Sequence, residues 1–326
     1  MKTFSTFALV ALSTLTMASC QKANPVETVP DGFRKVRFTV EGLNTKLTSA
    51  DKEKSVSSIQ VSVFDKNGNY VTGGQNSGST LELNVPVGVD SFKVCALANS
   101  KNKVYDINTI PSLLACKSEF GKADGLLEMF SLQEDAKLES GSTCSLKVKR
   151  FVAKVEIDAV KDSISYDHTL SLDRIYLINV GASADFKFNA DPSGMVYRQL
   201  GGFDPSETDI VAFTKDTVGH AFSAGKLYST PHFFYCYPNP TVTETGSARF
   251  TRLVVEATLN GSKYYYPVNI TGGGEGISSN KLYKVSQMTI TGPGSLSPDT
   301  PVSKQNLTFN IEVLDWDNGT SQAVVI

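Results

Sequence analysis

Residues suited to catalysis or metal binding are few, and their spacing assembles no site. The chain has three histidines, His168, His220 and His232. Only His232 has a cysteine close by, Cys236, and one such pair makes half of a zinc site. The loop Gly272–Gly276 lacks the final glycine of a dinucleotide fingerprint, and no carboxylate pair is marked out for glycoside hydrolysis. We therefore predict that the chain is not an enzyme and needs neither a metal nor a cofactor.

The segment Met1–Cys20 predicts a different chemistry, the covalent attachment of lipid. Lys2 precedes an apolar run that ends at Met17, and small residues follow, which is the pattern of a secretory signal. The run is too short for a transmembrane helix. Residues 17–20 resemble a bacterial lipobox, which implies cleavage after residue 19 and acylation of Cys20 on its sulfur and amino group. An ordinary signal peptide is the alternative. Two or more acyl chains hold a protein stably on a membrane.

Composition limits the partners and the redox state. Removal of the first 19 of 326 residues leaves 307, enough for two ordinary domains. The net charge is −2, and no basic block is present to follow phosphates, so nucleic acid is not a predicted partner. Four cysteines remain after Cys20, and they allow three pairings. Cys95 lies in an apolar run typical of a buried free thiol. Cys116 and Cys144 could pair within the N-terminal half, but spacing alone does not show a pair, and the disulfide state of the four, Cys236 included, stays open.

Period-two alternation of apolar residues indicates that nearly all elements are strands. In residues 36–40, Val36, Phe38 and Val40 alternate with polar side chains. The same pattern recurs in residues 59–63, 81–85, 152–157, 175–180, 253–259, 264–270, 283–290 and 307–313. Short strands separated by Gly, Asn, Asp and Pro predict an all-β chain built of sandwiches. Ile110–Phe130 has helical spacing instead, and we predict one or two short helices laid across the first sheet.

The organisation predicted for the chain is a tether followed by two domains. Residues 1–19 form the signal peptide, and residues 20–35 lack periodicity and form a flexible tether. The stretch Ser145–Glu156, preceded by a turn at Glu139–Ser142, marks the domain boundary. We therefore predict an N-terminal sandwich over residues 36–146 and a C-terminal sandwich over residues 147–326.

The last third of the chain carries a resemblance to a known family. Asn280–Val285 leads into Met288–Gly294, a Ser/Pro/Asp-rich link at residues 297–301, the strand Leu307–Val313 and then Trp316. Together these segments resemble the C-terminal region of the fimbrillin family, the type V pilin subunits of Bacteroidales. Residues 148–154 similarly resemble the start of the family's second domain, and residues 59–64 resemble an early strand of its first. The resemblance implies two tandem, transthyretin-like β-sandwiches.

The resemblance also implies how the chain would function. Such subunits travel to the outer membrane as lipoproteins, and a trypsin-like protease cuts after the first strand of the mature chain. In this sequence Val36, Phe38 and Val40 would face the core from the removable strand, and Lys46 is the candidate cleavage site. The best-known family pattern has arginine there, whereas Arg34 and Arg37 lie before or inside the strand. Either Lys46 is accepted, or the subunit stays uncut as an anchor or accessory component.

Donor-strand exchange would then join the subunits into a surface fimbrium that supports adhesion. The partners would be other pilin subunits, because an extended segment of one fills the groove opened in another. Within residues 306–326 the candidate donor residues are Leu307, Phe309, Ile311, Val313, Trp316, Val324, Val325 and Ile326. The alternative is that this segment is a final sandwich strand with a frayed end.

Two other functions remain open at this point. A surface lipoprotein adhesin or glycan-binding protein that never polymerises would use exposed aromatic residues, with Tyr235, Tyr237 and Tyr264–Tyr266 as the candidates. Aromatic residues alternating in strands are more often sheet packing. An extracellular hydrolase is a third reading, and it would require two carboxylates converging in a pocket.

Overall fold

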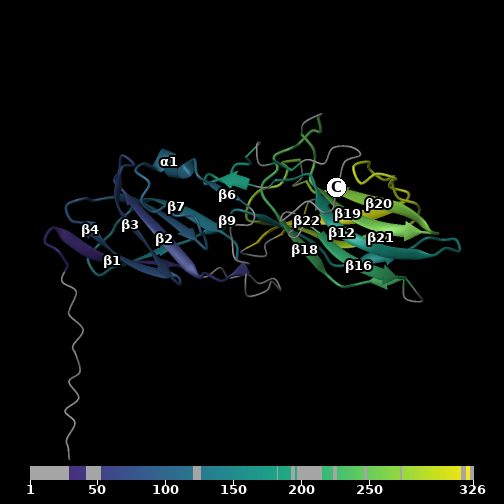
Figure 1. Ribbon diagram of the computed structural model, residues 1–326, viewed down its shortest axis with the longest axis horizontal. Coiled ribbons are helices and arrows are strands. Elements are labelled where there is room, and N and C mark those ends of the chain that lie inside the picture. The colour runs from purple at the N-terminus through teal and green to yellow at the C-terminus, as the bar shows by residue number, and fades with distance from the viewer. Residues whose placement is uncertain are drawn as a thin grey trace, which may run out of the picture.

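The protein has two β-sandwich domains that lie end to end along the long axis of the molecule (Figure 1). The structure is a computed structural model, which describes residues 29–41, 53–119, 126–181, 183–191, 195–196, 215–222, 226–245, 248–271, 274–316 and 321–323. Almost all regular structure in these residues is strand, with a short helix in the first domain. The predicted all-β fold of two tandem sandwiches is confirmed.

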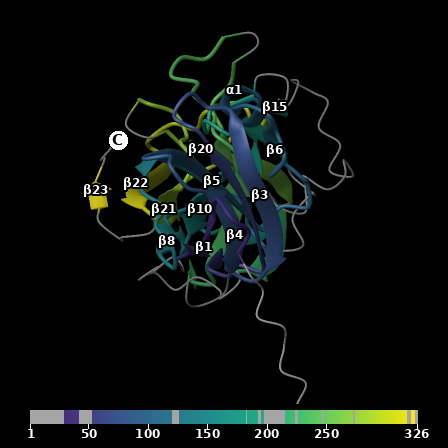
Figure 2. The ribbon, with the colours of Figure 1, turned by 90° about the vertical axis from the view of Figure 1, so that its left-hand side faces the viewer.

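The first domain packs a three-stranded sheet against a five-stranded sheet. The smaller sheet has the order β4 (Thr80–Pro86), β1 (Phe33–Val40) and β8 (Thr143–Leu146). The larger has the order β3 (Tyr70–Ser77), β2 (Ser58–Phe64), β5 (Phe92–Ala98), β7 (Met129–Ala136) and β9 (Lys149–Arg150). Figure 2 shows β8, β1 and β4 side by side. Alternate residues of β1 enter a core that both sheets share, because each sheet buries one face there.

The second domain packs a seven-stranded sheet against a four-stranded sheet around the largest core of the molecule. The path of the larger sheet is β17 (Leu227–Tyr228), β11 (Val160–Asp162), β21 (Lys281–Ile290), β10 (Ala153–Ile157) and β18 (His232–Cys236). Two more strands, β22 (Leu307–Asp315) and β23 (Ser321–Ala323), extend this sheet from β21. The smaller sheet has the order β16 (Lys215–Ala221), β12 (Leu170–Ile178), β19 (Arg252–Leu259) and β20 (Ser262–Asn269).

Of the one or two short helices predicted over Ile110–Phe130, the described residues contain one, at the start of the range. α1 (Ile110–Leu114) begins at the N-cap Thr109, whose hydroxyl accepts a hydrogen bond from the Ser112 amide. Its buried residues pack on the outer face of the five-stranded sheet, as predicted. The helical prediction is wrong for residues 129–130, which belong to β7. Both faces of β7 are buried there, so its apolar residues do not alternate and their spacing imitates a helix. Within the described residues, no helix is long and apolar enough to cross a membrane.

Paired backbone and buried aromatic rings join the two domains. β6 (Lys117–Glu119) of the first domain pairs with β14 (Ser183–Asp185) of the second. Beside this pair, the rings of Phe130 and Phe151 pack on Phe186, with centroids 4.9 and 5.1 Å apart. Because hydrogen bonds and apolar contacts both cross this boundary, the domains are fixed to each other by more than the chain that links them.

The chain crosses between the domains directly after β9. β9 still pairs with β7, and β10 begins at Ala153 in the second domain. We therefore propose that the crossover lies at residues 151–152, slightly beyond the boundary predicted at residue 147. Two remaining short strands of the second domain pair with each other, β13 (Val180–Gly181) and β15 (Met195–Val196).

Candidate functional site

β1 is the central strand of its sheet and is hydrogen-bonded along both edges. It pairs antiparallel with β4 over Phe33–Thr39 and parallel with β8 over Arg37–Val40. The three residues predicted to face the core do so, since Val36 and Phe38 are 0% exposed and Val40 is 2% exposed. Removal of β1 would therefore open an apolar slot flanked by two unpaired strand edges, which we call the β1 groove.

The outward face of β1 is charged and engages a single carboxylate on β4. Arg37 donates from Nε and Nη2 to Oε1 of Glu82 at 3.1 and 2.7 Å. Lys35 Nζ lies 3.3 Å from the other carboxylate oxygen. These hydrogen bonds, that from Arg37 foremost, hold the pKa of Glu82 below its usual value. On the outward face, Glu82 therefore favours a positively charged side chain on the strand that pairs with β4.

The two predicted processing sites lie outside the described part of the chain. They are the lipidation site Cys20 and the candidate cleavage site Lys46. After β1, the residues that the structure describes end at residue 41 and begin again at Glu53, which lies in the contact between the domains. The roles of Cys20 and Lys46 therefore stay predictions.

Glu53 ends the segment that follows β1, and it is buried against the second domain. Its Oε1 accepts a hydrogen bond from the Tyr235 hydroxyl at 2.5 Å and lies 3.1 Å from Lys154 Nζ. Its backbone carbonyl accepts two bonds of 3.2 Å from the Arg150 guanidinium. Burial, reinforced by the negative charge of Glu53, raises the pKa of the Tyr235 phenol, so the hydroxyl keeps its proton and donates.

Trp316 completes this group of residues, which we call the Glu53 cluster (Glu53, Arg150, Lys154, Tyr235 and Trp316). The Arg150 guanidinium lies 4.3 Å from the centroid of the Trp316 ring, and Tyr235 stacks on the same ring at 5.9 Å. Trp316 is the only tryptophan of the chain and is 1% exposed. The cluster therefore holds the end of the segment after β1 and the end of β22 in one buried contact.

The candidate donor residues fall into two groups. Leu307, Ile311 and Trp316 are buried, and β22 pairs along its length with β21. Phe309 and Val313 are partly buried against the same core. β23 pairs with β22 at the edge of the sheet, while Val324, Val325 and Ile326 lie outside the described residues. Residues 307–316 thus have the placement of the alternative, a final sandwich strand, and their role as donors stays a prediction.

The residues considered for other chemistry do not converge. His232 hydrogen-bonds Tyr228 at 2.7 Å, and burial raises the pKa of its suggested partner Cys236 to about 12. In the part of the chain that the structure describes, no group of three or more His, Cys, Asp or Glu side chains is placed to hold a metal. The four cysteines from Cys95 onward are free thiols. Of the candidate glycan-binding tyrosines, Tyr237 and Tyr266 are buried and the other three are partly buried.

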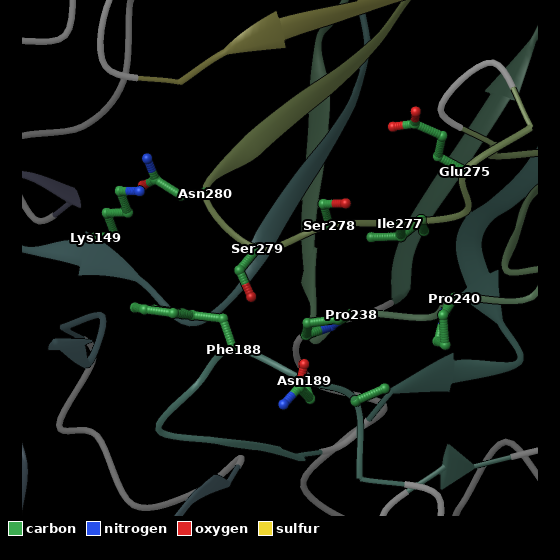
Figure 3. Close-up of a pocket in the computed structure, with 11 residues that line it drawn as sticks. Lys149, Phe188, Asn189, Pro238, Pro240, Glu275, Ile277, Ser278, Ser279 and Asn280 are labelled. Carbon is green, nitrogen blue, oxygen red and sulfur yellow. The ribbon is translucent and has the colours of Figure 1, made fainter. Parts of the chain in front are cut away.

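One pocket of about 390 Å³ lies where the two domains meet. Figure 3 shows the charged residues Lys149 and Glu275 on opposite sides of it, with Phe188, Pro238 and the Ser278–Asn280 turn between them. The charged groups are separated and do not face a common point. This arrangement does not present the convergent acid, base and nucleophile that catalysis requires.

Sequence reasoning missed the Glu53 cluster, although one of its members had a signal. Leu146, Val148, Arg150 and Val152 fall on alternate positions, and all four are buried. An arginine in register with apolar residues faces the interior and needs buried acceptors. No comparable pattern surrounds Glu53, which meets Tyr235 across 182 residues of sequence.

Comparison with known proteins gives structural similarity without close sequence similarity. No protein-family model matches the sequence, and no curated protein matches it. A candidate cell adhesion protein from Bacteroides eggerthii is 18% identical, with 88% of this chain and 97% of that chain covered and a TM-score of 0.66. A fimbrilin from Porphyromonas gingivalis is 16% identical, with 92% and 100% covered and a TM-score of 0.63. A candidate cell adhesion protein from Parabacteroides distasonis is 14% identical, with 87% and 100% covered and a TM-score of 0.61. The chain therefore has the fold of fimbrial and adhesion proteins of Bacteroidales.

Proposed function

We propose that this chain is a structural subunit of a surface pilus, exported as a lipoprotein and assembled by protease-triggered donor-strand exchange. The observation that carries the proposal is the place of β1, a central strand at the start of the described chain whose apolar inward residues Val36, Phe38 and Val40 are buried. Fimbrial and adhesion proteins of the same fold support it. The pilus would stand on the outer membrane, with lipid on Cys20 as its anchor before maturation, and would serve adhesion.

Maturation would cut the segment between β1 and Glu53. This segment contains Lys46, and a cut there would leave Leu47 as the new N-terminus. Arg34 and Arg37 are poorer sites, because their backbone is paired in the sheet and a cut there would leave part of β1 in place. The Glu53 cluster would retain the new end on the body of the subunit after β1 departs.

The exchanging segment would begin after Trp316. β22 is paired on both sides, and Trp316 is held by Arg150 and Tyr235, so residues 307–316 would stay in their own sheet as the root of the donor arm. Residues 317–326, including Val324, Val325 and Ile326, would extend into a groove of another subunit. Added main-chain hydrogen bonds and alternating side chains would stabilise that contact.

The test is incubation of the full chain with a trypsin-like protease, followed by unboiled gel electrophoresis and N-terminal sequencing. We expect a ladder of oligomers and a new N-terminus at Leu47. Lys46→Gln should prevent both, whereas the matched control Lys52→Gln should leave both unchanged. Deletion of residues 324–326 should abolish the ladder but not the cut. A protein that is cut and remains monomeric in every case would defeat the proposal.

A further inference from the structure

The β1 groove has a size requirement at its centre. Phe38 is the largest inward side chain of β1 and lies between Val36 and Val40 in the core cluster. Loss of β1 vacates the volume of a phenylalanine between Leu81 on β4 and Cys144 on β8, which stand opposite Phe38 and pack against the same core. An incoming aliphatic side chain would leave part of that volume empty, and cavities in a core are destabilising.

The groove also has a charge requirement, one residue away from the Phe38 position. Glu82 stands opposite Arg37 in the register of β1 and β4, one residue from Phe38. Both carboxylate oxygens of Glu82 have cationic partners, Arg37 on Oε1 and Lys35 on Oε2. When β1 leaves, both partners leave with it, and the groove gains an uncompensated negative charge at its rim.

We propose that the preferred occupant of the β1 groove is a strand from a different polypeptide, with an aromatic residue in the Phe38 pocket and a basic residue opposite Glu82. A second copy of this chain would be a weaker occupant, which suffices for a ladder in the concentrated purified protein. This inference rests on the proposed function and names the partner that it requires. Charge and shape complementarity at adjacent positions distinguish such a strand from other apolar segments, because a wrong partner both underfills the pocket and leaves the carboxylate unpaired.

A second copy of this chain offers a poorer match. Residues 317–326 read Asp-Asn-Gly-Thr-Ser-Gln-Ala-Val-Val-Ile and contain neither a basic nor an aromatic residue. Residues 305–316 also lack lysine and arginine, and they carry acidic Glu312 and Asp315. In either register the apolar side chains that the terminal segment could turn inward are aliphatic, and its other inward positions would be polar residues or glycine. Its only charged side chain, Asp317, is negative.

The experiment measures exchange of β1 for labelled peptides on the full chain after it has been cut between Val40 and Glu53. The probes are peptide 33–41, peptide 317–326, and two versions of peptide 33–41, one with Phe38→Val and one with Lys35→Gln and Arg37→Gln. Fluorescence anisotropy gives the affinities. Peptide 33–41 should bind at least about tenfold more tightly than peptide 317–326, with Phe38→Val weakening it on the order of tenfold. Loss of both cations should weaken it about two- to fivefold.

A protein variant isolates the charge requirement. In Glu82→Gln the cationic and neutral peptides should bind equally, whereas the control Glu134→Gln, which removes an exposed ion pair with Lys93, should keep the difference. Binding of peptide 317–326 as tight as that of peptide 33–41 would overturn this inference alone. If no peptide exchanges and β1 stays bound after the cut, strand exchange itself fails, and the proposed function falls with it.

Discussion

The two domains hold their first strands in the same way. In the first, β1 lies between antiparallel β4 and parallel β8. In the second, β10 lies between antiparallel β18 and parallel β21. Both strands send alternate side chains into a core that is fully closed around them. The arrangement alone therefore does not decide which strand can leave.

The difference lies in what surrounds each strand. On β1 the charges that pair with Glu82 are at the surface, and Arg37 is 57% exposed. On β10 Lys154 is 4% exposed and pairs with buried Glu53. β10 also continues after two residues into β11, which pairs with the same β21. We therefore expect β1, with exposed charges and a long connection, to be separable, and β10, with a buried ion pair and a short connection, to stay in its sheet.

The largest effect should come from placing a charge inside each strand. Val155→Asp in β10 should remove at least about 4 kcal/mol of stability, because the carboxylate would be buried without a partner. Hydrogen exchange should show lost protection in β19 and β21. Val36→Asp in β1 should leave those strands protected, and the exposed control Lys161→Ala should change neither domain. Loss of protection in the second domain of Val36→Asp would contradict the comparison.

Substitution of Glu53 and of Glu82 tests a buried ion pair against an exposed one. Glu53→Ala should lower the free energy of unfolding by about 3 kcal/mol, since buried Lys154 would lose its shorter ion pair and the Tyr235 hydroxyl its acceptor. Glu82→Gln should lower the free energy of unfolding by less than about 1 kcal/mol, because its partners are at the surface. Equal midpoints for the two variants in urea denaturation would show that the Glu53 cluster contributes no more than a surface pair.

A smaller effect should follow from a change of Arg150 that keeps its charge. Arg150→Lys loses the planar stack on Trp316 and part of the bonding to the Glu53 carbonyl, with an expected loss of about 1–2 kcal/mol. Because Trp316 is the only tryptophan, acrylamide quenching of its fluorescence reports on this contact alone. Quenching should rise in Arg150→Lys and stay unchanged in the exposed neighbour Lys149→Arg. Unchanged quenching in both would mean that Trp316 is held without Arg150.

The same comparison shows which features sequence reasoning can reach. β1 and β22 were predictable because one face of each is apolar and the other polar, so period-two alternation is direct evidence of a half-buried strand. Residues 129–130 were assigned wrongly because both faces of β7 are covered. The Glu53 cluster could not be found because its members come from distant segments and meet only in the folded chain. The local pattern therefore predicts the strands, whereas the tertiary contacts around each strand appear only in the folded structure.

The smallest expected effect is a change in the reactivity of two native cysteines, each of which lies opposite the first strand of its domain. Cys144 on β8 stands opposite Phe38, and Cys236 on β18 stands opposite Ala153. Burial raises the pKa of both thiols, that of Cys236 to about 12. Since only the thiolate reacts, a raised pKa lowers the rate of alkylation at pH 8.

Departure of β1 after the protease cut would uncover Cys144, so its pKa would fall toward the ordinary value and its thiolate fraction at pH 8 would rise. We expect several-fold faster labelling of Cys144 by iodoacetamide in the cut protein, followed by mass spectrometry of the peptides. Cys236 should remain unreactive in both forms, because β10 does not leave, and Cys95 in the opposite sheet of the first domain serves as the internal control. Faster labelling of Cys236 would mean that the cut loosens both domains. Unchanged labelling of Cys144 would mean that β1 stays in its groove, and that separability needs an incoming strand as well as a cut.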